Sequence, residues 1–344
     1  MAEKEMQNIE IEADGDVIFV CPHGLETTRR YRVSSTVVSR ASPVFKAMLR
    51  PHFKEGSTLL KDSRVEIELP DDDAWAMEII FNIMHLQNDC VESQLDVNGL
   101  EVIAQLVDKY QCATAIAPVV YYIMVKQVDT TTVSMKDLGR MLDCAYFCHQ
   151  HELFERICQR LILEASEPIR SDSSRVPDVF AALEDQRMGA LLSLSAFVQK
   201  DMLDSCNIRR QSWASCTLGC TFQDNYAVAS LRRLGKLELW PIPNAEKNSV
   251  QNILESMRKV LFEESMITNL QMCESTFTSC VGNSLCPRII SDARTKKYHT
   301  KAAETENGIR KFCLRCTRKG KVFGPEHLCT HEGITFPFAA KGEE

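Results

Sequence analysis

The stretch YRVSSTVVSRASPVFKAML, residues 31–49, decides the fold that the sequence predicts for the first third of the chain. Its first residues end a short strand, and Ser34 and Ser35 then offer hydroxyl groups that can accept the unpaired N–H groups at a helix start. Ser42 and Pro43 mark a second helix start, because proline lacks the N–H group that would have no partner at the first helical position. The stretch therefore predicts a strand followed by two consecutive short helices.

The segments on either side of this stretch complete an α+β pattern. Residues 16–21 (DVIFVC) predict an apolar strand, and the turn at 22–24 pairs it with the next strand as a hairpin. Residues 65–69 (VEIEL) alternate between apolar and charged side chains, which is the period of a half-buried strand. Three further helices are predicted: one after the acidic triplet 71–73, which supplies caps and favourable charge at its start, one around 100–107 and one at 115–126.

The remainder of the chain is predicted to be mostly helical, with a cysteine-rich end. A polar linker at 129–134 marks the first boundary. Apolar side chains at helical spacing then predict helices around residues 138–145, 153–162, 177–202, 225–234 and 249–261. From residue 272 onward this periodicity fades. We therefore expect three segments: a small sheet flanked by helices at 16–128, a helical domain at 134–265 and a cysteine-rich, basic tail at 270–340.

The order strand, strand, helix pair, strand, helix, helix pair over residues 16–126 resembles the BTB/POZ fold. The likeness is carried by five segments: DVIF at 16–19, the helical pair within 31–49, FKEG at 53–56, ELPDD at 68–72 and LVDKYQC at 106–112. The later chain is similar to fungal members of the family, in which a helical region and a Cys-x-x-Cys element with a later Cys-x-His follow the BTB domain. The segments that look like this pattern are 138–164, LWPIP at 239–243 and 313–331. By this resemblance the chain is identified as a fungal-type BTB/POZ domain-containing protein.

The resemblance implies association with other proteins rather than chemistry. The BTB/POZ fold presents helices and an edge strand on which another chain can dock, and self-association through such a surface gives a symmetric homodimer. Family members also bind cullin-type ubiquitin ligase scaffolds, so a substrate adaptor is an alternative. Arg32, Val33 and Ser34 stand where many animal members carry a histidine, so the partner-binding details of those members are not carried over.

The composition favours a folded intracellular protein. The chain has 344 residues, of which 44% are hydrophobic and 25% charged, proportions that are typical of globular proteins. The residues at 1–16 are acidic and polar, unlike a secretory signal peptide. The longest apolar run, 116–125, is about half the length that spans a bilayer. We expect a location in the nucleus or the cytoplasm.

One group of cysteines near the end of the chain has the spacing of metal ligands. Cys313 and Cys316 form a Cys-x-x-Cys turn, which places two thiolates on one side of the backbone. Cys329 and His331 are two residues apart and would point the same way on an extended segment. Together the four predict a structural Zn²⁺ site that would stabilise a tail with little apolar core, with His327 as a rival fourth ligand. A closed site of this kind leaves no position for a substrate, which argues against catalytic zinc.

The other cysteines are expected to be reduced, because their total of 15 is odd and no secretory signal precedes them. Most are expected to act as small buried apolar residues. Two pairs with helical spacing are assigned to the core: Cys144 and Cys148, which His149 and His151 follow, and Cys216 and Cys220. A second metal site would need a group whose spacing fits no standard zinc pattern: Cys273, Cys280, Cys286 and His299.

The net charge of −7 conceals an asymmetry. Between Arg288 and Lys321, 11 Lys and Arg stand against 3 Asp and Glu, a local balance of +8, so the other residues carry −15. Such a basic segment either binds nucleic acid or an acidic partner, or forms a solvent-exposed surface with no binding role. A nuclear regulatory factor that contacts nucleic acid through the basic, zinc-bearing tail is therefore a further alternative. Against it, the segment lacks the downstream His-x₃₋₅-His of a zinc-finger helix.

The sequence contains none of the common enzymatic signatures. The P-loop, Gly-x-Gly-x-x-Gly after a strand, His-Glu-x-x-His and Gly-x-Ser-x-Gly are all absent. The acidic triplet 71–73 stands at a predicted helix start, where capping explains it better than metal binding. We therefore predict a non-enzymatic protein–protein interaction scaffold.

Overall fold

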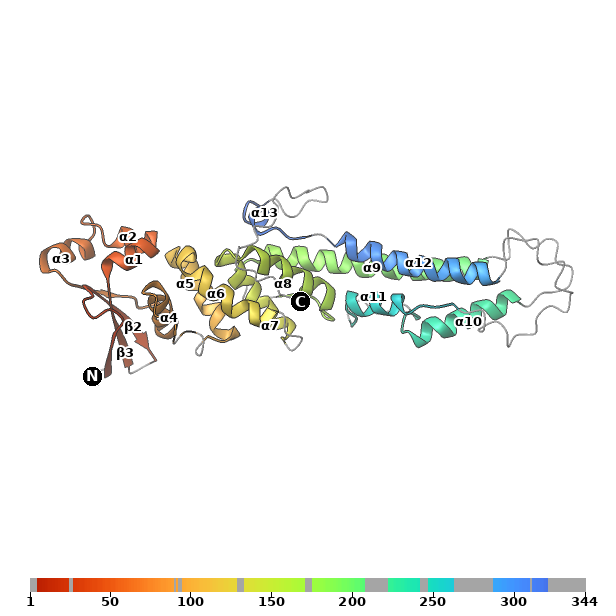
Figure 1. Ribbon diagram of the computed structural model, residues 1–344, viewed down its shortest axis with the longest axis horizontal. Helices are drawn as coiled ribbons and strands as arrows, with labels where there is room; N and C mark the ends of the chain where they lie inside the picture. The colour runs from red at the N-terminus through yellow and green to blue at the C-terminus, as the bar shows by residue number, and fades with distance from the viewer. Residues whose placement is uncertain are drawn as a thin grey trace, which may run out of the picture. The chain divides into compact units, whose positions relative to one another are not determined.

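The structure is a computed structural model, and it describes residues 5–24, 27–89, 91, 95–128, 133–170, 175–207, 222–241, 247–262, 287–309 and 311–320. These residues form an α+β protein, in which a four-stranded mixed sheet with helices is followed by a mostly helical region (Figure 1). They divide into two compact units that alternate along the chain. The first unit takes the described residues up to 158 together with 175–177 and 312–320, and the second takes those of 159–170 and 178–311.

The sheet of the first unit has the strand order β1-β3-β2-β4. Its strands are β1 (Glu5–Glu10), β2 (Val17–His23), β3 (Thr27–Val33) and β4 (Val65–Glu68). β2 and β3 form the predicted antiparallel hairpin, with Val17 opposite Val33. β4 runs parallel to β2 and β1 runs parallel to β3, so β1 and β4 are the edge strands. The sequence did not predict β1, because its six residues (EMQNIE) do not alternate regularly between apolar and polar.

The structure describes nine helices or parts of helices in the first unit, and serine or aspartate side chains cap five of them. They are α1 (Ser35–Ala41), α2 (Pro43–Met48), α3 (Lys54–Asp62), α4 (Ala74–Met84), α5 (Val97–Tyr110), α6 (Ala113–Val128), α7 (Met135–Phe147), the first part of α8 (His151–Glu164) and α13 (Leu314–Arg318). The Ser42 hydroxyl accepts the Phe45 N–H at 3.1 Å, and Asp73 accepts the Ala76 N–H at 2.8 Å, as the sequence predicts. Ser34 caps α1, whereas Ser35 is helical and donates to Asp16.

An aromatic cluster fills the space between the sheet and the helices of the first unit. The Phe19 ring, on β2, lies 5.0 Å from both the Phe45 ring on α2 and the Phe81 ring on α4. Phe81 also lies 5.8 Å from Tyr31 on β3, and Phe45 stacks on Tyr110 at 4.3 Å. All five side chains are almost completely buried. Rings at these separations add to the stabilisation from burial alone, so this aromatic cluster joins the β2–β3 hairpin to α2, α4 and α5.

A buried carboxylate connects the turn before α4 to the end of α5. Asp72 is 4% exposed; its Oδ1 accepts a hydrogen bond from Lys109 at 2.6 Å, and its Oδ2 accepts one from the Tyr110 hydroxyl. Burial, with the hydrogen bond to Asp72 as a further cause, raises the pKa of Tyr110 far above its usual value. The Tyr110 carbonyl in turn accepts the Ser42 hydroxyl at 2.6 Å. Asp72 is therefore the centre of a polar network beside the aromatic cluster.

We expect Asp72→Ala to lower the free energy of unfolding of the first unit by about 1–3 kcal/mol, because the Tyr110 hydroxyl loses its acceptor inside the protein. Denaturant titration of the full chain, followed by circular dichroism, measures this change. Asp71→Ala, at an exposed neighbour, is the matched control and should change stability by less than about 0.5 kcal/mol. Equal effects of the two substitutions would contradict the assigned role of Asp72.

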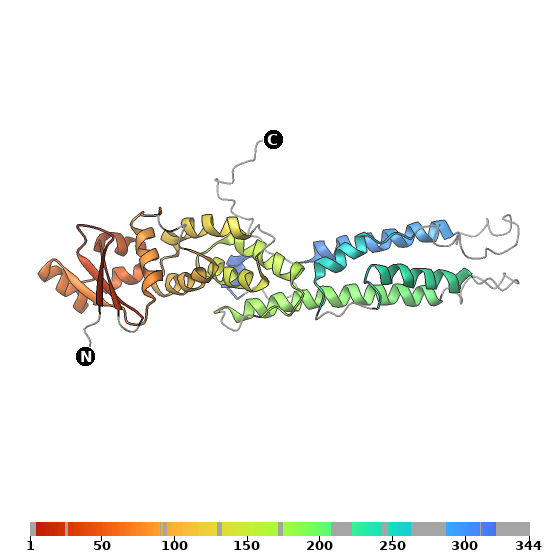
Figure 2. The same cartoon turned by 90° about the horizontal axis from the view of Figure 1, so that it is seen from below.

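The second unit is built from four helices and the end of α8 (Figures 1 and 2). They are α9 (Pro177–Asn207), α10 (Phe222–Lys236), α11 (Val250–Arg258) and α12 (Pro287–Gly308). Figure 2 shows α11 and α12 running alongside α9 and α10. Their shared core includes Leu191, Leu194, Val198, Met202, Leu234, Ile253, Leu254, Met257, Tyr298 and Ala302. Across the part of the chain that the structure describes, no helix is both long and apolar enough to cross a membrane.

α12 lies where the sequence predicted no helix, and its buried face explains why. Besides Tyr298 and Ala302, that face contains Arg294, which is only 5% exposed. Arg294 donates to Asp201 of α9 at 2.7 Å and to Ser230 of α10 at 2.6 Å, and its guanidinium lies 4.3 Å from the centre of the Phe262 ring. Reading apolar periodicity alone cannot find a helix whose buried face contains an arginine.

We expect Arg294→Ala to destabilise the second unit by about 3–5 kcal/mol, because it leaves the Asp201 carboxylate buried without its partner. The double substitution Arg294→Met/Asp201→Leu should recover most of this loss, since an apolar pair of similar volume needs no compensating charge. Lys297→Ala, at an exposed lysine on the same helix, is the control. Thermal and denaturant unfolding measure the stability of the three variants. If Arg294→Ala destabilises the protein no more than Lys297→Ala does, the expectation is wrong.

Candidate functional site

α3 is held against the turn that precedes it by a glycine. A Cβ atom added to Gly56 would lie 2.1 Å from the Arg50 carbonyl oxygen, so only glycine permits this close approach. The Phe53 N–H donates to the same carbonyl at 3.0 Å, and the Ser57 N–H donates to the Phe53 carbonyl at 2.9 Å. The buried side of α3 is therefore fixed by backbone contacts, which leaves its longer side chains to face outward.

Two large apolar side chains are exposed at α3, one at its N-cap and one near its end. Phe53 is 52% exposed and Leu60 is 76% exposed. Phe53 is the N-cap residue of α3, with extended backbone angles, and Leu60 lies seven residues further along, near the end of the helix. Leu59 beside them is partly buried. We call Phe53 and Leu60 the α3 face.

The rim of the α3 face is predominantly basic. Four exposed cationic residues lie within four residues of Phe53 or Leu60 in the sequence: Arg50, Lys54, Lys61 and Arg64. Asp62 is the one fully exposed acidic residue between residues 50 and 64, and Glu55 is partly buried. An apolar centre with a charged rim is the general anatomy of a protein interface, and the sign of this rim favours an acidic partner.

The adjacent edge strand β4 is poorly suited to pairing with another strand. Val65 and Ile67 point into the core, whereas Glu66 and Glu68 are exposed. Glu66 forms an ion pair with Arg30 on β3. Charged side chains and a length of four residues are the usual means by which an edge strand avoids indiscriminate pairing. In this part of the first unit, side-chain docking on the α3 face is therefore favoured over strand addition.

The structure describes two of the four predicted zinc ligands, and both lie at the start of α13. Cys313 is the N-cap residue, and its carbonyl accepts both the N–H and the hydroxyl of Thr317 at 2.9 Å. Cys316 is the third helical residue and is 2% exposed. N-cap and third-position side chains lie on the same side of a helix start, which is the arrangement that two ligands of one ion need.

The other predicted ligands, Cys329 and His331, lie outside the described residues, as do the rival His327 and the cysteines 216, 220, 273, 280 and 286. Among the residues that are described, no group of three or more His, Cys, Asp or Glu side chains is arranged to hold a metal ion. His299, proposed for a second site, lies on α12, where a ring nitrogen is 3.0 Å from the Val260 carbonyl oxygen.

Five further cysteines are buried core residues, as predicted: Cys21, Cys112, Cys144, Cys148 and Cys158. Cys144 and Cys148 are fully buried with their sulfur atoms 3.9 Å apart. Burial raises the pKa of Cys21, with Asp72 and Asp73 adding to the effect, and it raises the pKa of Cys112; both thiols reach about 12. These two thiols stay protonated at neutral pH, which makes them poor nucleophiles and poor metal ligands.

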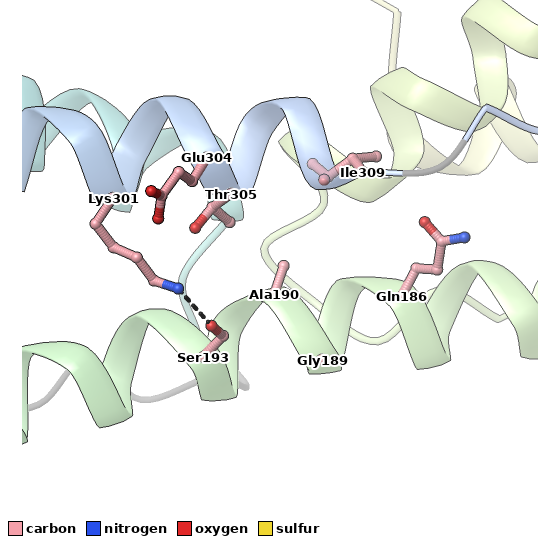
Figure 3. Close-up of a pocket in the computed structure, with 9 residues that line it drawn as sticks. Gln186, Gly189, Ala190, Ser193, Lys301, Glu304, Thr305 and Ile309 are labelled. Atoms are coloured by element: carbon pink, nitrogen blue, oxygen red, sulfur yellow. Dashed lines mark hydrogen bonds between the residues drawn. The ribbon is translucent and has the colours of Figure 1, made fainter. Parts of the chain in front are cut away.

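A groove of about 370 Å³ lies between α9 and α12 in the second unit (Figure 3). Its lining residues are Gln186, Gly189, Ala190, Ser193, Lys301, Glu304, Thr305, Gly308 and Ile309. The Lys301 ammonium group crosses the groove and donates to the Ser193 hydroxyl at 3.0 Å. The groove exists because Gly189, Ala190 and Gly308 are too small to fill the space between the helices. The titratable side chains in its lining are Lys301 and Glu304, one helical turn apart on α12.

Comparison with known proteins adds no family assignment, since no protein-family model matches the chain and no curated protein matches it. The likeness of its sequence to the BTB/POZ family therefore stays a prediction.

We expect the full chain to contain about one Zn²⁺ per molecule, because Cys313 and Cys316 already share one side of a helix start. Elemental analysis of the purified protein measures the ratio. The double substitution Cys313→Ser/Cys316→Ser should remove the bound zinc. Cys158→Ala, which removes a buried core thiol, should leave the zinc content unchanged. A folded wild-type protein that contains no zinc after purification in zinc-supplemented buffer would refute the site.

Proposed function

We propose that this protein is a non-enzymatic interaction scaffold whose first unit, a BTB/POZ-type module, binds a partner protein through the α3 face. The observation that carries the proposal is the exposure of Phe53 at the N-cap of α3 and of Leu60 near the end of the same helix. Both side chains are large and apolar, and together they form an anchor that water covers in the isolated chain. The mixed sheet with its helices and the sequence likeness to the family support the module type.

The energetics of the α3 face suit a reversible interaction. Complete burial of a phenylalanine or leucine side chain contributes about 1.5–3 kcal/mol, so two such anchors supply a substantial part of a specific affinity. The basic rim would accelerate association with an acidic surface and orient it. We therefore expect the partner to present an apolar pocket or ridge flanked by aspartate and glutamate.

The family resemblance suggests two specific partners for this face. One is a cullin-type ubiquitin ligase scaffold, in which case the protein would act as a substrate adaptor without chemistry of its own. The other is a second copy of the first unit, which would give a homodimer. In either case we propose that the second unit and a zinc-bearing tail supply specificity, and that the protein acts in the nucleus or the cytoplasm.

Direct contact with nucleic acid receives less support from the structure. The basic balance between Arg288 and Lys321 includes Arg294, whose charge is paired with Asp201 inside the second unit. The Arg318 guanidinium lies 5.6 Å from the centre of the Tyr146 ring in the first unit. Because Arg294 is buried and paired, the positive charge available to phosphate groups is smaller than the sequence count indicates.

We expect the double substitution Phe53→Glu/Leu60→Glu to reduce partner capture by the full chain at least tenfold, since each factor of ten requires the loss of about 1.4 kcal/mol and both anchors become charged. Affinity purification with quantitative mass spectrometry measures the captured proteins and shows whether a cullin is among them.

Leu86→Glu is the matched control, because Leu86 is 84% exposed in the same unit but lies away from α3 in the sequence. It should leave capture unchanged. If the Phe53→Glu/Leu60→Glu protein is folded by circular dichroism and retains the same partners as wild type, the α3 face is not the binding site.

A further inference from the structure

α9 has apolar side chains on two opposite sides. Its inner side includes Leu191, Leu194 and Val198 in the core of the second unit. Its outer side includes Leu192 and Leu203, which are 61% and 56% exposed. These two leucines are 11 residues apart, which is close to three helical turns, so they lie in one line along the helix.

The outer line has the spacing of a helix–helix interface. Its exposed members, in steps of three and four residues, are Asp185, Gly189, Leu192, Ala196, Gln199 and Leu203. Alternating steps of three and four are the heptad spacing with which one helix packs against another. Gly189 stands where this line borders the groove beside α12, and a Cβ added there would meet no atom within 4 Å. We call these six residues the α9 seam.

The small residues of the seam would let a second helix approach closely. Gly189 and Ala196 lie on either side of Leu192, so the seam has a large side chain between two recesses. A leucine from a facing helix could then pack over Ala196, while Leu192 packs over a small residue of the facing helix. A second copy of α9 that runs in the opposite direction provides both the leucine and the small residue.

The charges at the two ends of the seam select that direction. Asp185 stands at its first residue, and Lys200 stands beside its last turn; both are exposed. Neither forms an ion pair with any residue that the structure describes. Two parallel copies would place Asp185 next to Asp185 and Lys200 next to Lys200. Two antiparallel copies would instead place Lys200 of each chain near Asp185 of the other, which forms two ion pairs by symmetry.

We propose that the α9 seam binds the α9 seam of a second copy of this chain, with the two helices antiparallel and Leu192 of each copy facing Ala196 of the other. The interface is isologous, and it does not use the α3 face. Each assembly would therefore present two first units, so that a partner with two acceptor sites would be bound bivalently. The dimer stands independently of the function proposed for α3.

The test is the mass of the full chain in solution over a concentration series, by light scattering and analytical ultracentrifugation. We expect a reversible dimer with twice the monomer mass of 39.0 kDa. Asp185→Lys and Lys200→Asp should each weaken dimerisation about tenfold, because each turns two attractive pairs into two repulsive ones. An equimolar mixture of the two variants should dimerise again, as should the double variant Asp185→Lys/Lys200→Asp. This restoration shows that both single variants are folded.

Three outcomes would overturn the proposal. The first is a full chain that stays monomeric at every concentration. The second is a dimer that neither single charge reversal weakens more than Lys297→Asp, which makes the same charge change on the exposed surface of α12. The third is a dimer that Phe53→Glu/Leu60→Glu dissociates while the α9 variants do not, since that result would place self-association in the first unit and leave the α3 proposal standing.

Discussion

The packing of Phe19, Tyr31, Phe45, Phe81 and Tyr110 is the interaction on which the first unit depends. These rings come from the sheet, α2, α4 and α5, and their mutual distances of 4.3–6.0 Å leave no space for water between the layers. Asp72 and Ser42 then fix Tyr110 through its hydroxyl and its carbonyl group. Phe53 and Leu60 are not part of this core, since their side chains are 52% and 76% exposed. Their exposure is consistent with a role outside the fold, namely contact with a partner.

The parts of the fold that the sequence predicted are those governed by local chemistry. Ser42 with Pro43 predicted the start of α2, and Asp73 predicted the start of α4. Ser249 predicted the start of α11, where its hydroxyl accepts the Asn252 N–H at 3.1 Å. The alternation of residues 65–69 likewise predicted β4. The long α9 was predicted to end near residue 202 and runs to Asn207.

The elements that the sequence did not predict depend on distant partners. β1 is held by pairing with β3, and α12 by the buried contact between Arg294 and Asp201. α3 is an exception, because its contact at Gly56 is with Arg50, only six residues earlier in the chain. The same limit applies to the candidate sites. The spacing of Cys313 and Cys316 identified a pair of metal ligands, but no pattern in the sequence distinguishes the exposed Phe53 and Leu60 from core residues, since that distinction depends on where α2 and β4 place the helix.

The central claim is that a partner protein covers α3. Hydrogen–deuterium exchange of the full chain, measured alone and after addition of the captured partner, tests it most directly because backbone amides report coverage without any substitution. The account predicts slower exchange over residues 53–62 on partner binding, with the amides of β2 and β3 unchanged. Slower exchange confined to other elements, with residues 53–62 exchanging as fast as in the isolated chain, would contradict it.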